Sequence, residues 1–478
     1  MKRFRHILLV VLLLALSACG KEMLLEAVFE PVADQAIPQE GGNYSVAVEY
    51  RTTKSYYAGI EYRLNLGQTI GAVQSISGKV DKIDFTVPAN ESYESRSVRL
   101  AVNSEGHWSV VFSGTQAGLV KPDPDPDPED KPEDSQWQSA AAAVAAMKTG
   151  WNLGNTLDSH GDWILKYTEC KPSDFETAWG QPVTKAETIK AFAAAGFGAI
   201  RVPVTWGPHM DSFGTVDKAW MDRVEEVVNY VLDAGLYCVL NVHHDTGTEG
   251  WMHADKAIYE ATDDKFKGLW KQIAERFEKY GEKLIFEGYN ELLDASNYWN
   301  YPKNKADFAY ANAYNQDFVN TVRATGGNNL RRNLVCVTYC AGAGADNIAG
   351  FVLPEDEWSN HLIAEVHSYA PYFFAFAIDN PAQNQTVFDA AAEKEIKGII
   401  NDLAERFTNN GIPCIIGEYG AANKDNMAER CKQAACYVGN AKKQGIVCFH
   451  WMGLMDGADR STCTWTEPDL RDAILGAL

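Results

Sequence analysis

The pattern of apolar and polar residues changes once along the chain, across a segment rich in proline and aspartate at residues 121–134. Before it, stretches such as 44–50, 82–87 and 97–102 alternate apolar with polar residues, and turn-forming residues separate them. After it, continuous apolar runs are followed by longer segments in which apolar residues recur every three or four positions. The first pattern predicts half-buried strands, and the second predicts buried strands joined by amphipathic helices. We therefore expect an all-β region followed by an α/β region.

The α/β region contains eight apolar runs of strand length, and helical periods lie between most of them. Eight such units over about 340 residues are typical of a (β/α)₈ TIM barrel, which we expect for residues 137–478. A doubly wound sheet would share the alternation, but no glycine-rich phosphate fingerprint follows the first run. The fifth helix, around 345–351, is the least regular. The expected strands are 150–153, 199–205, 237–242, 284–288, 334–338, 362–366, 413–417 and 446–450, and the other expected helices are 185–195, 219–234, 265–280, 306–324, 392–409 and 426–444.

The all-β region is expected to form a separate N-terminal domain, joined to the barrel by a linker. Residues 24–118 have the strand spacing of a small immunoglobulin-like β-sandwich. The linker at residues 119–136 is expected to be extended, because alternating proline favours polyproline II and like charges repel one another.

The N-terminus has the pattern of a targeting segment. Basic residues at 2, 3 and 5 precede a short apolar run at residues 7–16, which is too short for a comfortable membrane span. The sequence Leu16-Ser17-Ala18-Cys19-Gly20 resembles a bacterial lipobox. The resemblance implies a lipoprotein signal peptide at residues 1–19, with Cys19 acylated and exposed as the new N-terminus. The alternative is an ordinary signal peptide with an incidental cysteine.

Composition narrows the classes of partner and cofactor. The formal net charge of −21 disfavours nucleic acid, whose recognition needs clustered Lys and Arg. Of the ten cysteines, Cys19 belongs to the leader, and the nine that remain are an odd set rather than a disulfide framework. Cys336 and Cys340 lack the spacing and the neighbouring histidine of a zinc site. We expect no metal and no cofactor.

Polar residues follow six of the eight expected strands. Each of these residues alone is weak evidence for an active site, since a glutamate at a strand end is most often solvated and an arginine there usually forms an ion pair. In a parallel barrel, however, the carboxyl ends of the strands together form the active site. Two carboxylates on different strands are what the hydrolysis of a glycosidic bond needs. The residues are Arg201, His243, His244, Asn290, Glu291, His367, Tyr369, Glu418 and Trp451.

These strand ends, with their flanking residues, resemble glycoside hydrolase family 5, the cellulase family, over nearly all of residues 137–478. Two positions depart from the family pattern: Leu292 stands where a proline is usual, and His450 stands where a tryptophan is usual. The matching segments are 150–158, 176–180, 200–204, 241–244, 290–291, 366–369 and 417–420.

The resemblance implies a role for each strand-end residue. Glu291 would be the general acid/base and Glu418 the nucleophile of a retaining mechanism, with their carboxyl groups about 5 Å apart. The remaining residues would bind the substrate or orient the two glutamates: Arg201 and Tyr369 beside Glu418, Asn290 on the sugar 2-hydroxyl, His243, His244 and His367 on hydroxyls and on the acid/base, and Trp451 and Trp179 on sugar rings.

Exposed aromatic residues should line the substrate site, because sugar rings stack on aromatic faces. Each candidate has the alternative of being an ordinary core residue. The candidates are Trp179, Trp206, Trp251, Trp299, Tyr372 and Trp465.

The sequence therefore predicts an endo-acting, retaining β-1,4-glucanase whose substrate is a cellulose-type β-glucan: cellulose, xyloglucan or mixed-linkage glucan. The alternatives are an endo-β-1,4-mannanase and a non-catalytic, surface glycan-binding lipoprotein. An esterase or lipase would want a Gly-x-Ser-x-Gly elbow, which does not occur.

The region before the linker resembles a BACON-type domain, a common N-terminal module of bacterial glycan-degrading proteins. The resemblance rests on Gly41-Gly42, the turn at 88–92 that leads to Arg96, and the closing Gln116-Ala117-Gly118. We expect it to act as a spacer rather than to bind carbohydrate. With the lipobox, it predicts a monomeric lipoprotein on the outer membrane and cell surface of a Gram-negative bacterium, or else on the periplasmic face.

Overall fold

A computed structural model describes residues 137–478 of the chain throughout. Of the N-terminal part it describes residues 14–16, 23–25, 27–29, 32–50, 60–67, 69, 71–77, 80–90, 92, 95–104 and 107–118. Cys19, most of the expected signal peptide and the whole linker at 119–136 lie outside the described residues. The chain divides into two compact units, Met1–Pro132 and Glu133–Leu478. Among the described residues no helix is both long enough and apolar enough to cross a membrane.

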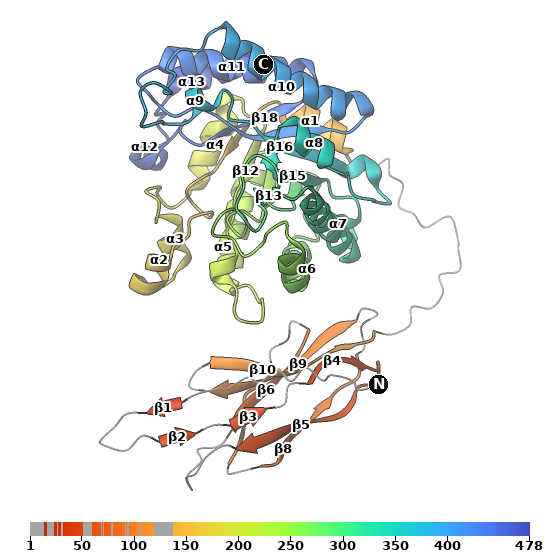
Figure 1. The fold of residues 1–478 in the computed structure, drawn as a ribbon. Helices are drawn as coiled ribbons and strands as arrows, with labels where there is room; N and C mark the ends of the chain where they lie inside the picture. Colours follow the sequence, from red (N-terminus) through yellow and green to blue (C-terminus); the bar gives the residue numbers. More distant parts are fainter. Residues whose placement is uncertain are drawn as a thin grey trace. The chain divides into compact units, whose positions relative to one another are not determined.

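The first unit is all-β, as predicted, and has two main sheets (Figure 1). Burial in its strand β8 alternates residue by residue, so that Ile83, Phe85 and Val87 point into the core. The Phe85 ring meets that of Phe112 from the other sheet at 4.9 Å between centroids. One sheet has the order β4 (Val32–Ile37), β10 (His107–Gln116), β9 (Arg96–Ser104), β6 (Ile60–Leu66) and β7 (Gln74–Ile76); the other is β3 (Ala27–Phe29), β5 (Gly42–Tyr50) and β8 (Lys82–Val87); β1 (Leu14–Leu16) pairs with β2 (Met23–Leu25).

The residues that carry the BACON resemblance hold this unit's turns together. The buried Gln116 side chain donates to the carbonyl oxygens of Gln39 and Pro88, at 3.0 and 2.8 Å. It accepts a hydrogen bond from Nε of Arg96 at 2.8 Å, and Arg96 also donates to the carbonyl of Pro88. These side chains are used within the unit, so they have a structural role.

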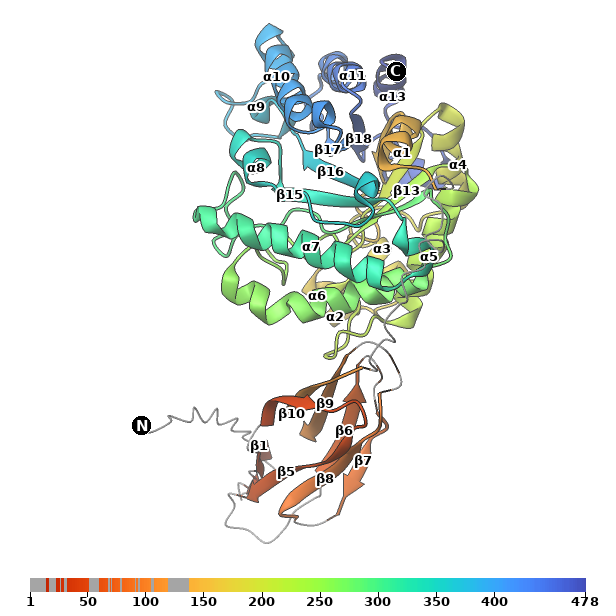
Figure 2. The same ribbon diagram turned by 90° about the vertical axis from the view of Figure 1, so that its right-hand side faces the viewer.

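The second unit is a closed barrel of eight parallel strands in sequence order, and the predicted TIM barrel is confirmed (Figures 1 and 2). Every predicted strand is present, with ends that differ by a few residues. They are β11 (Gly150–Asn152), β12 (Ala199–Val202), β13 (Tyr237–Asn241), β14 (Leu284–Glu287), β15 (Leu334–Gly342), β16 (Leu362–His367), β17 (Cys414–Tyr419) and β18 (Val447–Trp451).

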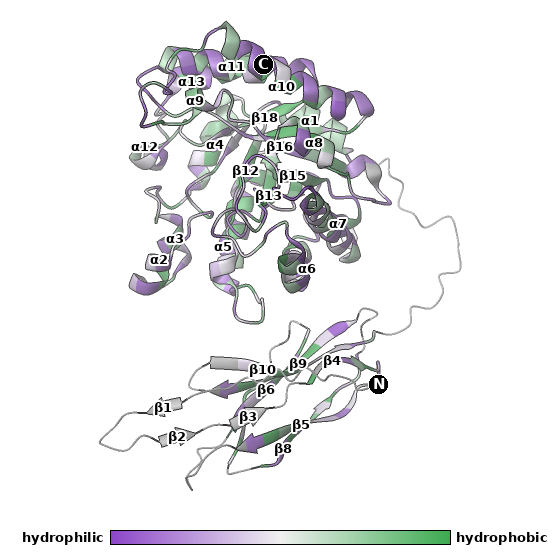
Figure 3. Cartoon of the chain, in the orientation of Figure 1, coloured by the Kyte–Doolittle hydropathy of each residue, from purple (hydrophilic) through white to green (hydrophobic). Residues whose placement is uncertain are grey.

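Helices surround the barrel, and their outer faces are more hydrophilic than the strands they cover (Figure 3). The helix after β13 starts at Lys256, earlier than predicted, because Asp255 caps the backbone N–H groups of Ala257 and Ile258. The weakly patterned fifth helix is a short α8, Ala345–Gly350. The helix that follows β13 is α6 (Lys256–Arg276), and the remaining helices are α1 (Ala140–Met147), α2 (Asp162–Tyr167), α3 (Pro172–Glu176), α4 (Ala186–Ala195), α5 (Lys218–Asp233), α7 (Phe308–Ala324), α9 (Tyr372–Ala375), α10 (Ala390–Arg406), α11 (Met427–Lys443), α12 (Gly457–Thr462) and α13 (Pro468–Gly476).

The inside of the barrel has an apolar lower layer and a polar upper layer. The lower layer packs against α1 and includes Val239, Ile285 and Ile363. Two residues further along the same strands, on the same face, stand the buried polar residues Asn241, Glu287 and Glu365. The strands thus change from apolar to charged as they approach their carboxyl ends, where the functional residues are expected.

Candidate active site

Arg201, at the inner face of β12, is the electrostatic centre of the site. It is fully buried and forms a bidentate ion pair with Glu287, both contacts being 2.7 Å. Its Nη1 donates to Oε1 of Glu418 at 2.8 Å, and its Nη2 donates to Oδ1 of Asn290 at 2.8 Å. Nε also lies 3.7 Å from Oε1 of Glu365. Burial opposes the charge of Arg201, but the three carboxylates outweigh it and hold the pKa of Arg201 well above its ordinary value, so the guanidinium stays charged.

Glu418 on β17 is held on both oxygens. Arg201 donates to Oε1, and the hydroxyl of Tyr369 donates to Oε2 at 2.7 Å. Burial raises the pKa of Glu418 above its ordinary value, while His367, Arg201 and the Tyr369 hydroxyl act in the opposite direction. The expected neighbours of Glu418 are therefore in place, and burial outweighs their lowering of its pKa.

Glu291 follows β14, and its carboxylate approaches the same nitrogen of His367 as that of Glu418 does. Nδ1 of His367 donates to Oε1 of Glu291 at 2.8 Å and lies 3.6 Å from Oε2 of Glu418. One oxygen of Glu291 lies within 4.8 Å of one oxygen of Glu418. Retaining glycosidases have their two carboxyl groups about 5 Å apart, and the closest oxygens of this pair fit that arrangement.

His367 is surrounded by carboxylates and carries a positive charge at neutral pH. Burial lowers its pKa, but Glu418, Glu291 and Glu365 together raise it to about 10. Beneath it, Glu365 is fully buried, and burial with the nearby Glu287 raises the pKa of Glu365 to about 7. Among the described residues neither Glu365 oxygen accepts a hydrogen bond, although Nε2 of His367 is only 3.4 Å away.

The tautomer of His243 is fixed by Asn241, two residues earlier on β13. The amide oxygen of Asn241 accepts from the backbone N–H of Val204 at 3.1 Å, which orients the amide so that Nδ2 faces His243. Nδ2 lies 3.0 Å from Nδ1 of His243, which must therefore be the unprotonated nitrogen. Burial lowers the pKa of His243 well below its ordinary value, so the ring is neutral. Its Nε2–H is left as a donor.

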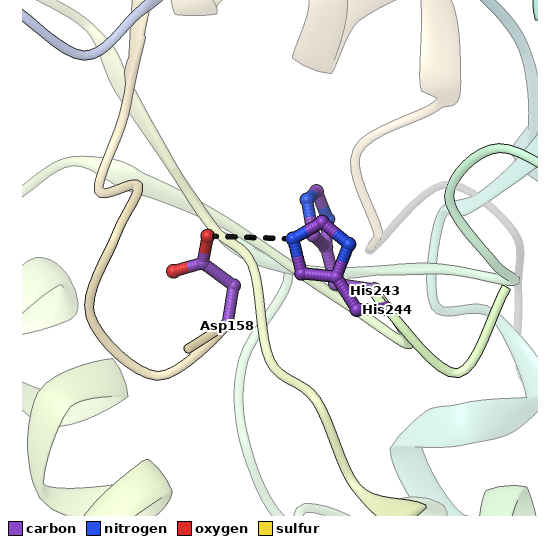
Figure 4. Close-up of side chains that lie close together, drawn as sticks. All are labelled: Asp158, His243 and His244. Carbon is purple, nitrogen blue, oxygen red and sulfur yellow. Dashed lines mark ion pairs between the residues drawn. The ribbon is translucent and has the colours of Figure 1, made fainter. Parts of the chain in front are cut away.

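His244 forms a second cluster with Asp158, shown with His243 in Figure 4. Nε2 of His244 lies 3.9 Å from Oδ2 of Asp158, whose carboxylate accepts backbone N–H groups from residues 155 and 156. Burial lowers the pKa of His244 to about 3 and raises that of Asp158 to about 6. The predicted Trp179 ring lies 5.4 Å from that of His244, so Trp179 lies beside this cluster, half-buried.

Trp451, at the end of β18, is half-buried and lies parallel to the ring of His243, at 5.7 Å and 4°. It rests on Gly154, where a Cβ would come within 3.0 Å of the indole. The unusual His450 beside it is buried, and its Nδ1 lies 3.0 Å from the carbonyl of Met452. His450 is thus bonded to the backbone, and the tryptophan retains its predicted place.

The other predicted aromatic platforms differ in how far they are exposed. The prediction that Trp206 lines the substrate site is wrong, because its side chain is fully buried and donates to the backbone carbonyl of Asn241. The Trp465 ring is partly buried and packs against the core, with its centroid 4.8 Å from that of Phe192, so it is not an exposed platform. Trp251 is half-buried, hydrogen-bonded to Asp245 and covered by Lys265. Trp299 and Tyr372 are exposed, as predicted.

Five polar residues of the site were not predicted from the sequence. Asn152, Asn241, Glu287 and Glu365 are fully buried in strands, and Asp158 is buried in the loop after the first strand. Asn152 accepts from Nη1 of Arg201 at 2.9 Å. A usable signal existed, because Glu287 and Glu365 interrupt otherwise apolar runs at positions that share a face with Ile285 and Ile363.

Within the part of the chain that the structure describes, two groups of three side chains lie close enough together to hold a metal ion: Asp158 with His243 and His244, and Glu291 with His367 and Glu418. In the second group, His367 is protonated and Glu418 is paired with Arg201, which disfavours a cation there. In the first, the Asp158 oxygens already accept backbone hydrogen bonds.

Known proteins place the chain among the glycoside hydrolases. Residues 157–454 match the family model of cellulase, glycosyl hydrolase family 5. Endoglucanase A of Ruminococcus albus is 38% identical over 70% of this chain and 92% of its own length. A xyloglucan-specific endo-β-1,4-glucanase of Bacteroides ovatus is 30% identical over 81% of this chain and 80% of its own length. The crystal structure of a family 5 enzyme from Prevotella bryantii, in complex with a xyloglucan tetradecasaccharide, is 40% identical, covers 71% of this chain and 99% of that one, and superposes with a TM-score of 0.66.

These relatives confirm the predicted endo-β-1,4-glucanase activity and favour neither the mannanase nor the binding-only alternative. The chain therefore belongs to glycoside hydrolase family 5, the cellulase family.

Proposed function

We propose that Glu418 is the nucleophile and Glu291 the general acid/base of a retaining endo-glucanase. The observation that carries this assignment is the closeness of their oxygens, within 4.8 Å. The two environments differ in their hydrogen-bond donors and in their exposure. Glu418 is held by donors from Arg201 and Tyr369, which favour a carboxylate ready to attack. Glu291 is the more exposed of the two, as expected of a group that must reach a leaving oxygen and then a water.

The reaction proceeds in two displacements. In the first, an oxygen of Glu418 bonds to the anomeric carbon while the bond to the leaving sugar breaks, and Glu291 gives its proton to the departing oxygen. In the second, water attacks the same carbon, its proton passes to Glu291, and Glu418 leaves as a carboxylate. Asn290 accepts from Arg201 through its amide oxygen, so its Nδ2 is turned toward the ligand as a donor for a sugar hydroxyl.

Azide rescue tests the two roles separately. In Glu291→Ala the glycosyl-enzyme still forms on a substrate with a good leaving group, and azide attacking it gives a β-glycosyl azide. In Glu418→Ala azide replaces the missing nucleophile and gives the α-anomer. Glu291→Ala should lower kcat on a polymer about 10²–10⁴-fold. The assignment fails if the two anomers are exchanged or if both variants give the same one.

For the substrate, we propose xyloglucan as the preferred β-glucan, with mixed-linkage glucan and cellulose chains as weaker substrates. The support is the xyloglucan specificity named for the Bacteroides ovatus relative and the xyloglucan bound to the Prevotella bryantii enzyme. The test is a panel of xyloglucan, barley β-glucan, carboxymethylcellulose and mannan, with products sized by chromatography. Early release of mixed oligosaccharides and the highest kcat/KM on xyloglucan support the proposal, whereas faster hydrolysis of barley β-glucan or mannan overturns it.

We further propose that Cys19 carries a lipid that anchors the enzyme to the outer membrane, with the BACON-like unit and the linker as a spacer at the cell surface. The support is the lipobox at residues 16–20 and the Pro- and Asp-rich stretch at 121–134. The Bacteroides ovatus match also extends over a larger share of the chain than the barrel unit makes up. Incorporation of labelled palmitate that is lost in Cys19→Ser tests the anchor, and digestion by external protease in intact cells tests the surface location.

A further inference from the structure

Glu365 is a buried carboxylate of the site that the proposed mechanism does not use. It is fully buried on β16, two residues before His367. Among the described residues neither of its oxygens accepts a hydrogen bond, and Nε2 of His367 has no partner either. Burying a polar group without a partner is costly, and these two unpartnered groups lie only 3.4 Å apart. Their closeness indicates that each is meant to serve the other.

Arg201 has no donor to spare for Glu365, although its Nε lies 3.7 Å from Oε1 of that carboxylate. A guanidinium has five N–H groups, and all five of Arg201 are used. In the part of the chain that the structure describes, Nε2 of His367 is then the donor within reach of Glu365. The acceptors of the five bonds are Glu287 for Nε, Asn152 and Glu418 for Nη1, and Glu287 and Asn290 for Nη2.

The other nitrogen of His367 serves the two proposed catalytic carboxylates. Nδ1 donates to Oε1 of Glu291 at 2.8 Å and lies 3.6 Å from Oε2 of Glu418. The bond to Glu291 occupies Oε1 and leaves Oε2 as the oxygen that carries the acid proton. A ring that donates from both nitrogens holds its charge best where both acceptors are carboxylates. Glu365 supplies the acceptor that the Nε2 side otherwise lacks.

We propose that Glu365 is a positioning residue that accepts the Nε2–H of His367 and so keeps the ring charged, with Nδ1–H fixed on Oε1 of Glu291. This inference rests on the proposed function and adds a residue that acts on the acid/base through His367, without contact with the substrate. The separation of 3.4 Å is slightly longer than a usual N–H···O hydrogen bond of about 2.7–3.2 Å, and opposite charges on the two groups favour closing it.

The groups around Glu365 set the pH range in which it acts. Burial and Glu287 raise its pKa to about 7, against the opposing effects of Arg201 and His367. Above that pH Glu365 adds a negative charge beside His367, which favours the protonated forms of both His367 and Glu291. The acid form of Glu291 therefore extends to higher pH. The other titratable groups nearby are Cys336 on β15 and Cys414 on β17, both neutral because burial raises their pKa, and Glu418 on β17, which approaches Nδ1 of the same histidine.

The test compares the pH profile of kcat/KM on barley β-glucan for the full wild-type chain and Glu365→Gln. The amide keeps the size of the side chain and one acceptor oxygen but never carries the charge. The alkaline limb should move to lower pH by about half a pH unit or more, while the acid limb, where Glu365 is already protonated, stays in place. Glu176→Gln is the matched control, because Glu176 is also buried and pairs with an arginine, Arg223, but lies on α3, outside the barrel. Its two limbs should stay at the wild-type pH.

Histidine NMR with ¹⁵N labelling provides a readout that does not depend on turnover. The pKa of His367 should be lower in Glu365→Gln than in wild type, because one of the carboxylates that raise it is gone. An unchanged pKa of His367 overturns the inference, and so does an alkaline limb that stays in place or that moves equally in Glu176→Gln. The proposed function fails on a different result, which is wild-type kcat in Glu291→Ala, so the two failures are distinguishable.

Discussion

The carboxylate of Glu365 occupies the space that a Cβ on residue 417 would need. An ideal Cβ on Gly417 would lie only 1.5 Å from Oε1 of Glu365. The two residues belong to neighbouring strands, β16 and β17, and Gly417 directly precedes Glu418. The glycine before the proposed nucleophile therefore allows a second, buried carboxylate to sit beneath His367.

Gly417→Ala should displace Glu365 and damage both stability and activity. Overpacking of this kind costs about 1–3 kcal/mol of unfolding free energy. Urea denaturation and kcat on barley β-glucan measure the two effects. The matched control is Gly398→Ala in α10, where an added Cβ meets no atom within 4 Å and should be neutral or slightly stabilising. Normal activity in Gly417→Ala would show that the position of Glu365 does not matter to the site.

Glu365→Gln should change how stability depends on pH. Because burial and Glu287 raise the pKa of Glu365 to about 7, the folded state holds this proton more tightly than the unfolded state does. The stability from that proton is complete below the ordinary pKa, about 4.5, and is lost as pH rises through about 7. The variant cannot ionise, so it should gain about 2–4 kcal/mol relative to wild type between pH 4.5 and pH 8.

Urea denaturation of both proteins at pH 4.5, 6 and 8 gives the difference directly. A difference that stays constant over this range, or that falls, would mean that Glu365 is ionised throughout, paired with Arg201 and His367.

How far the sequence predicts this site depends on where each residue stands in its strand. The eight strands are predictable because they are continuous apolar runs, and the strand-end residues such as Glu418 are predictable because the barrel brings those ends together. The sequence does not predict Glu287 and Glu365 as site residues, because they lie inside the apolar runs. There the pattern indicates only a strand, and a charged side chain is normally excluded. Arg201, which pairs with Glu287, comes from another strand, so only the closed barrel reveals why the burial of Glu287 is tolerated. His367 lies two residues after Glu365 on β16, and its charge depends on glutamates from other strands.

The aromatic residues were the least predictable part. Trp206 and Trp299 both follow barrel strands, yet one is fully buried against β13 and the other is exposed. Which face of a loop meets the core depends on tertiary packing, and the local pattern around a single tryptophan does not carry that information.

His367 should stay protonated in the free enzyme well above neutral pH. With its pKa raised to about 10, its charge contributes stability that is complete below about pH 6.5 and is lost as pH rises toward 10. Among the carboxylates that raise this pKa, Glu418 contributes most, so Glu418→Gln should lower it. Histidine NMR with ¹⁵N labelling follows both. A wild-type His367 that titrates near pH 6.5, or a pKa unchanged by Glu418→Gln, would contradict the charge arrangement described for the site.

Arg201→Lys keeps the charge but should be one of the most damaging single changes in the barrel. One guanidinium serves Glu287 through two contacts, Glu418 through a third and Asn290 through a fourth, and an ammonium has neither the reach nor the planar set of donors to replace them. Carboxylates left buried without full pairing cost about 3–5 kcal/mol, so the variant should unfold at much lower urea concentration. Arg223→Lys is the matched control, because Arg223 also pairs bidentately with a buried glutamate, Glu176, but lies on α5, outside the barrel. If the two substitutions cost the same stability and Arg201→Lys retains wild-type kcat, the arginine is a structural ion pair with no special tie to the catalytic carboxylates.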